Sequence, residues 1–136
     1  MTIYNQSSVS VFIDGVEQRD LAEGDSIVVS YSTDYSTLTP AGAGSQNGSL
    51  SLATDRSGTI TITYKNVSES LTFVRGLKTA QELGVFTPVD IIVAGGSQDF
   101  LNAFSCSLQT MGDMTTGGPV HGNRAVIFNS TRITEI

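Results

Sequence analysis

The sequence predicts a mainly β protein with one α-helix, built as a β-sandwich or open β-barrel of about seven strands with the helix on its flank. Apolar and polar residues alternate with a period of two over several short stretches, as they do in half-buried strands. The period changes to between three and four only once, from Val67 to Ala80. Glycine, asparagine and aspartate separate these stretches, and these residues favour tight turns.

Two strands are predicted in the N-terminal third of the chain. Val9, Val11 and Ile13 share one face of the first strand, and Asp14-Gly15 follows as a turn signal. The second strand is predicted over residues 27–32, where apolar and polar residues alternate in the same way.

Residues 36–48 are small and flexible and are predicted to form a long loop. Loops of this length are uncommon inside a compact domain, and many of them bind a partner. Two interpretations of this stretch remain open. It is either a binding element or a mobile surface loop without a further role. Asn47-Gly48 then turns the chain into the next strand.

A tight hairpin is predicted around Asp55-Arg56-Ser57-Gly58. Leu50 and Leu52 alternate with serines before it, and β-branched residues alternate from Thr59 to Tyr64 after it. An aspartate can cap a turn through its carboxylate and a glycine can adopt a left-handed conformation, so a four-residue connection is favoured. On the second strand, Ile60, Ile62 and Tyr64 are expected to face the core.

One helix is predicted after this hairpin. Its apolar residues fall on a single stripe, namely Val67, Leu71, Val74, Leu77 and Ala80. Asn66 with Glu69 three residues later is a plausible capping pair, and Gly84 is the expected stop.

The C-terminal third returns to strands, which are predicted over 89–94, 100–108 and 123–131. A second glycine-rich loop, 109–122, is expected between the last two.

Composition and charge exclude several classes of protein. The 136-residue chain carries 7 basic and 13 acidic residues, a net charge of −6. The basic residues are scattered, whereas a nucleic-acid-binding protein clusters them, so no such binding is expected. One domain, 1–136, is expected from the length. The sequence shows no signal peptide and no apolar run of membrane-spanning length, which predicts synthesis in a cytoplasm.

No residue pattern supports a catalytic, cofactor-binding or metal site. The only histidine, His121, and the only cysteine, Cys106, do not stand at the spacing of zinc ligands. Carboxylates between Asp20 and Asp25 lie in a polar connection, where exposure to solvent explains them. We therefore expect no enzyme activity. Cys106 is expected to be a small buried side chain or an intersubunit thiol, and His121 a loop or interface residue.

The stretch Asp55-Arg56-Ser57-Gly58-Thr59-Ile60-Thr61 resembles the Asp/Asn-Arg-Ser-Gly-Thr-Ile-Thr stretch of one group of tail-tube proteins from contractile-tailed bacteriophages. The order of elements is also similar: a strand ending in an Asp-Gly turn, a second strand, a long loop, this stretch and a helix. In the last strand Ile127 and Phe128 stand where the family has a tryptophan.

The resemblance implies hexameric rings that stack into a hollow tube inside a contractile sheath, with the strands of adjacent subunits continuing one sheet. It further implies a virion location and contacts with sheath, tape-measure and baseplate proteins. DNA would pass through the lumen without specific binding, helped by the net negative charge.

The resemblance also implies that the 36–48 loop reaches the next ring. The candidate inter-ring residues are Thr39, Pro40, Ala41, Gly42, Ala43, Gly44 and Ser45. Arg56 is a candidate subunit contact through a carboxylate across the ring, or it solvates its turn. The alternatives to a phage tail tube are the inner tube of a type VI secretion system or tailocin and, from a different class, an adhesion or carbohydrate-binding β-sandwich.

Overall fold

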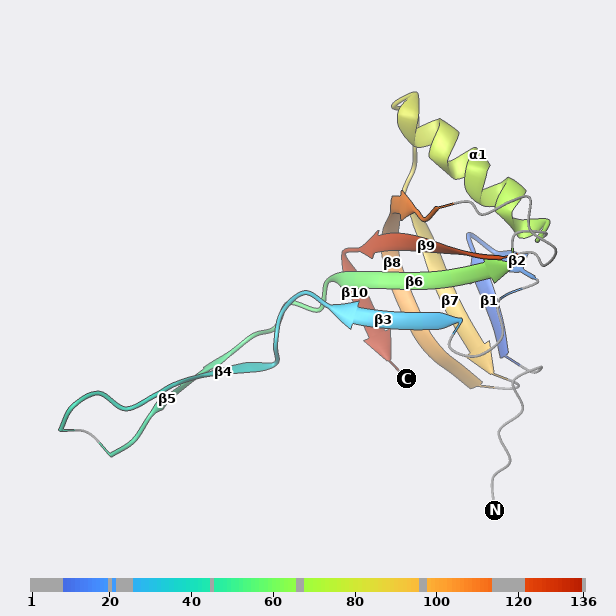
Figure 1. Ribbon diagram of the computed structural model, residues 1–136. Coiled ribbons are helices and arrows are strands. Elements are labelled where there is room, and N and C mark those ends of the chain that lie inside the picture. The colour runs from blue at the N-terminus through green and yellow to red at the C-terminus, as the bar shows by residue number, and fades with distance from the viewer. Residues whose placement is uncertain are drawn as a thin grey trace, which may run out of the picture.

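The computed structural model describes residues 9–19, 21, 26–44, 46–65, 68–95, 98–113 and 122–135 (Figure 1). Within these ranges the chain forms ten strands and one helix, so the predicted mainly β fold with a single helix is confirmed. The elements are β1 (Val9–Ile13), β2 (Val16–Gln18), β3 (Ile27–Tyr31), β4 (Ser36–Thr39), β5 (Ser49–Leu52), β6 (Gly58–Lys65), α1 (Ser70–Glu82), β7 (Val89–Gly95), β8 (Gln98–Met111), β9 (Asn123–Ser130) and β10 (Arg132–Glu135).

Two antiparallel layers share the long strand β8. One layer has the order β2-β1-β7-β8-β10, and the other has the order β8-β9-β6-β3. Figure 1 shows β3, β6 and β9 crossing in front of β1, β7 and β8. The molecule is thus a sandwich with crossed layers, in which one strand turns the corner between them.

The corner of β8 lies at Ser105, where the backbone has a φ of 51°. The pairing of β7 with β8 shifts register between Val89 and Ile91, beside this residue. The Asp90 carboxylate accepts the Ser105 backbone N–H at 3.0 Å and so holds the bulge. A bulge bends a strand and increases its twist, which lets β8 serve both layers.

The core lies between the two layers, and β6 shows how the sequence builds it. Its residues alternate strictly between buried and half-buried, with Ile60, Ile62 and Tyr64 fully buried as predicted. The Tyr64 hydroxyl donates to Gln18 Oε1 at 2.9 Å, so this buried polar group has a partner. Burial raises the pKa of Tyr64, which keeps the phenol neutral.

The helix α1 covers one end of the sandwich through Leu71 and Val74, which are buried as the periodicity predicts. It ends at Glu82, and Gly84 two residues later has a φ of 73°, the expected left-handed stop. At its start the Ser68 hydroxyl accepts the Ser70 N–H at 3.2 Å and donates to the carbonyl of Arg19. The predicted Asn66–Glu69 capping pair is not formed through Glu69, which makes no capping bond, and Asn66 lies outside the described residues.

The strand predicted over 123–131 is confirmed as β9, which ends at Ser130. A further strand, β10, follows it and was not predicted, and Thr131 separates the two opposite the corner of β8. The predicted 109–122 loop begins later than expected, since β8 continues to Met111.

The predicted hairpin at Asp55 to Gly58 is also wrong. Strand β5 pairs with β4, while β6 pairs with β3 and β9, so these four residues do not turn one strand onto the next. Instead β3–β4 and β5–β6 are the two sides of one long hairpin. The predicted 36–48 loop is therefore the outer part of this hairpin, with β4 on one side.

Candidate assembly surfaces

The outer part of the long hairpin, residues 33–56, projects from the sandwich, and we call it the arm (Figure 1). Its strands pair with Leu38 opposite Leu50 and Ser36 opposite Leu52. Because side chains alternate across a strand, the three leucines share one face, and Thr37, Thr39, Ser49 and Ser51 share the other. The leucines Leu38, Leu50 and Leu52 are 65%, 69% and 81% exposed. The arm thus presents an apolar face to solvent.

The far end of the arm carries six of the predicted inter-ring residues, Thr39, Pro40, Ala41, Gly42, Ala43 and Gly44, all of them exposed. Ser45, the seventh, lies outside the described residues. Gly44 has a φ of 82°, a conformation that glycine adopts without strain. At Gly48 a β-carbon would meet the carbonyl oxygen of Thr39 at 2.6 Å, so the two sides approach closely here. Their role between rings stays a prediction.

A bulge lies at the root of the arm. Ser32 N–H donates to Ser57 O, and Ala53 N–H donates to Tyr35 O, both at 3.0 Å. Between these two hydrogen bonds, the outgoing strand has two residues, between Ser32 and Tyr35, and the returning strand has three, between Ala53 and Ser57. The returning strand therefore carries one extra residue. The sequence from Asp55 to Gly58 therefore bends the hairpin away from the sheet instead of turning it back.

Asp55 holds this bulge through its carboxylate. It accepts the backbone N–H of Ser57 at 3.0 Å and the hydroxyl of Thr33 at 3.3 Å. The hydrogen bonds from Ser57 and Thr33 lower the pKa of Asp55, because they favour its charged form.

Arg56 closes the root by contacts within the chain. Its guanidinium carbon lies 3.8 Å from the centroid of the Tyr35 ring, and its nitrogens donate to the carbonyls of Asp55 and Ala53 at 2.7 and 3.0 Å. Its own carbonyl accepts the Ile133 N–H, which ties β10 to the root. No ion pair of Arg56 is found among the described residues. Its predicted role in a subunit contact stays a prediction.

Two strands end the sheet path, β2 and β3, and each pairs on one side only. Val16 and Val28 are the exposed apolar residues of these edges. Unpaired edges of this kind can pair with another chain.

The outer faces of the two layers differ in chemistry. On the β3-β6-β9 layer the outward residues are mainly hydroxyls and amides, including Thr59, Thr61, Thr63, Asn123 and Asn129. Val28, Ala125, Ile127 and Lys65 lie on the same face. No carboxylate lies on this face among the described residues.

The outer face of the other layer carries a row of neighbours, Phe12, Ile92, Asn102 and Thr134, that crosses four strands. Phe104 lies two residues from Asn102 on the same face, and we call these five residues the Phe104 face. Ile92 and Phe104 are 37% and 39% exposed. Oδ1 of Asn102 is buried without a hydrogen-bond donor in the described structure.

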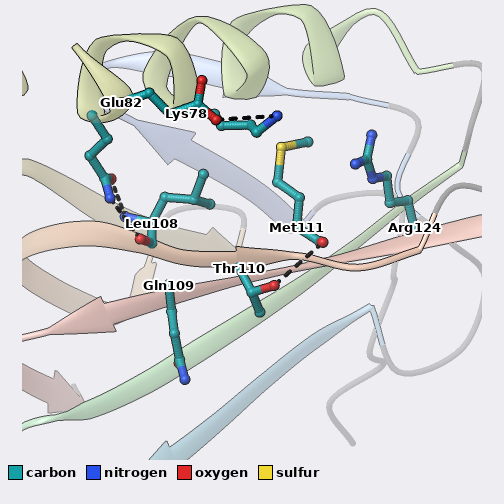
Figure 2. A pocket seen from close by; sticks show the side chains of 8 residues that line it. Lys78, Glu82, Leu108, Gln109, Thr110, Met111 and Arg124 are labelled. Atoms are coloured by element: carbon teal, nitrogen blue, oxygen red, sulfur yellow. Dashed lines mark hydrogen bonds and ion pairs between the residues drawn. The ribbon is translucent and has the colours of Figure 1, made fainter.

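A cleft of about 370 Å³ lies between α1 and the ends of β8 and β9 (Figure 2). Gln81 donates to the Leu108 carbonyl and accepts the Leu108 N–H, at 2.9 and 2.7 Å, and so ties the helix to β8. Lys78 pairs with Glu82 at 3.5 Å, and Arg124 donates to the Gly112 carbonyl at 2.9 Å. The cleft lining holds no nucleophile beside a base. Its residues instead attach α1 to β8 through the bonds between Gln81 and Leu108.

Over the described part of the chain, no group of three metal-ligating side chains comes together, and no helix is long and apolar enough to cross a membrane. His121 lies outside that part.

Cys106 is fully buried, which confirms its prediction as a small core residue. Burial raises the pKa of its thiol, which keeps it in the unreactive neutral form. We expect iodoacetamide at pH 8 to modify the native protein at least about tenfold more slowly than the urea-unfolded chain, measured by intact mass. Equal rates would show that this part of the core opens readily.

The fold thus combines crossed antiparallel layers that share one bent strand, a helix over one end and a projecting β-arm. No family model matches the chain, and no curated protein matches its sequence.

Three solved structures share the fold at low identity. One is the PVC sheath–tube complex of an extracellular contractile injection system in the extended state, with a TM-score of 0.65 and 12% identity over 97% of this chain and 91% of that one. The second is the cap that terminates the tube of the anti-feeding prophage, with a TM-score of 0.68 and 10% identity over 98% and 91%. The third is the PVC sheath/tube terminator in the extended state, with a TM-score of 0.70 and 12% identity over 98% and 96%. The resemblance to contractile tail-tube proteins is thus confirmed at the level of the fold.

Proposed function

We propose that this chain is a structural subunit of a bacteriophage tail tube. Six copies form a ring, and the rings stack into a hollow conduit for DNA inside a contractile sheath. The fold shared with contractile injection systems supports this proposal.

The observation that carries it is the apolar face of the arm. Three leucines that each expose about two thirds or more of their surface stand on a projection that the rest of the described chain does not cover. Burying one leucine is worth roughly 1.5–3 kcal/mol, so this face favours association. A protein that works as a monomer, such as a ligand-binding module, would have no use for an exposed leucine face.

Ring closure accounts for the edge strands as well. Edge strands β2 and β3 bound the sheet, and pairing one edge with the other edge of a neighbour removes both. Such a head-to-tail contact closes a ring when its rotation divides a full turn evenly.

The acidic lining of the lumen is part of the proposal. Several described carboxylates stand on turns, among them Asp14, Asp34, Asp55 and Asp113, and others lie beside the Phe104 face. A lumen wall formed by the β3-β6-β9 layer would carry hydroxyls, amides and Lys65 but none of these carboxylates, so the acidic lining requires that the turns border the lumen.

The inner tube of a type VI secretion system or a tailocin is the nearest alternative, because the same arm and edges would serve it. Neighbouring genes for a capsid and a tape-measure protein would favour the phage tail. An adhesion or carbohydrate-binding module is the alternative from another class, and it predicts a stable monomer.

Electron microscopy of the purified chain at rising concentration tests the proposal. We expect sixfold rings that stack into tubes. Rings that never stack would favour a terminating role like that named for two of the structural neighbours. A chain that stays monomeric at millimolar concentration, also with sheath and baseplate proteins added, would overturn the proposal.

A further inference from the structure

We propose that the leucine face of the arm docks on the Phe104 face of a second copy of this chain. The inference deepens the proposed function, on which it rests, by naming the surface that receives the arm. It follows from reach, from the chemistry of the outer surfaces and from one unpaired polar atom.

The direction of the arm excludes its own sandwich as the receiver, and its length lets it span a neighbour. About ten residues separate Tyr35 from the arm tip at Gly44, or roughly 30 Å of extended chain. That length matches the diameter of a compact chain of this size, whose radius of gyration is about 14 Å. The contacts of Arg56 and Asp55 hold the root, and Figure 1 shows the arm pointing away from both layers. The leucines therefore meet another molecule.

The chemistry of the outer surfaces selects the receiver. The β3-β6-β9 face carries two apolar side chains, Val28 and Ile127, with Thr61 between them, and its other side chains are mainly hydroxyls and amides. The cleft beside α1 offers Lys78, Glu82 and Arg124. Placing leucines there would strip water from polar groups that gain no new partner. The Phe104 face offers two aromatic rings and an isoleucine, with its charged residues Glu17, Asp90 and Arg132 at the rim.

Two exposed apolar residues after the helix, Leu83 and Val85, are the other candidates. Leu83 and Val85 lie on the loop between α1 and β7, which offers a narrower surface than a sheet face. A paired two-stranded arm needs a flat receiver several strands wide, and the Phe104 face crosses β1, β7, β8 and β10.

Asn102 supplies the second observation. Its Oδ1 is buried within the Phe104 face and has no donor in the described structure, although buried polar atoms are normally paired. Ser36 pairs with Leu52 and therefore lies on the leucine face of the arm, where its hydroxyl is a hydrogen-bond donor. Docking brings this donor to the face that lacks one.

Disulfide trapping tests this contact in the full-length chain. Chains with Leu50→Cys are mixed with chains carrying Phe104→Cys, or Ile92→Cys as a second receiver position, and are oxidised under assembly conditions. A disulfide requires Cα atoms within about 7 Å, so linkage reports direct contact. Cys106 is fully buried and stays in place, and each variant oxidised alone measures background. We expect at least about a tenfold excess of linked pairs in the mixtures over each single variant.

Thr61→Cys on the β3-β6-β9 face is the matched control receiver, and we expect no linkage to it. Assemblies that link Leu50→Cys to Thr61→Cys, or to another Leu50→Cys, while both Phe104-face positions stay unlinked would overturn the inference and leave the proposed function standing. A wild-type chain that never assembles would overturn both.

Discussion

Replacing Leu50 and Leu52 by serine is expected to give a folded monomer that no longer assembles. Both side chains are exposed in the single chain, so their loss removes no core packing. If the arm buries them on association, each contributes about 1.5–3 kcal/mol. The pair then shifts the association constant by roughly two to four orders of magnitude. Analytical ultracentrifugation measures the shift, and thermal unfolding of the monomer should change by less than about 0.5 kcal/mol.

The opposite face of the arm supplies the control. Thr37 and Ser51 are paired on it and are equally exposed to solvent. Alanine at both positions should leave assembly within about tenfold of wild type. An equal loss from both pairs of substitutions would mean that the arm acts through its backbone alone, and the leucine face would have no special part.

Replacing Gly58 by alanine is expected to destabilise the sandwich itself. Gly58 lies where β6 leaves the root of the arm, and a β-carbon there would collide with the carbonyl oxygen of Ser30 and crowd Tyr31 on β3. The collision is with backbone, so β3 must move away from β6. We expect a loss of about 2 kcal/mol or more and a fall in Tm of roughly 6 °C or more, read by calorimetry.

Gly76 provides a matched substitution of the opposite sign. It lies on the exposed side of α1, and no atom lies within 4 Å of the β-carbon that alanine would add. Alanine there should stabilise the protein by about 1 kcal/mol because glycine weakens a helix interior. If Gly58→Ala left the Tm unchanged, the close approach of β3 and β6 would not be needed for the fold.

Local patterns predicted the elements well where burial is one-sided. Alternation in β6 and the helical stripe of α1 report directly on which side chains meet the core, and both are confirmed. Local patterns do not predict which strands pair. Leu50 and Leu52 alternate with serines in the same way whether their strand pairs with β6 or with β4. Residues 55–58 have turn chemistry, but a bulge uses the same residues as a turn, and only the partner strands distinguish them.

The candidate site was predicted in part. The arm tip was identified because the stretch 36–48 is long and rich in small residues. The sequence did not show that the leucines beside it are exposed. A usable signal was present, since Leu38 and Leu50 stand symmetrically around the glycine-rich stretch, as partners in a hairpin do. The Phe104 face carried no local signal, because Phe12, Ile92 and Phe104 come from three strands far apart in sequence.

In the proposed assembly, the charge of the outer arm decides how stability depends on salt concentration. Residues 36–53 contain no ionisable side chain, while the whole chain carries a net charge of −6. Dissolved ions leave apolar cohesion intact and largely screen the repulsion between charges of acidic subunits that lie more than about 8 Å apart at physiological ionic strength. If the proposed tubes are held by such arms, we expect them to stay intact at high salt and to dissociate first at low salt, the reverse of a complex held by ion pairs.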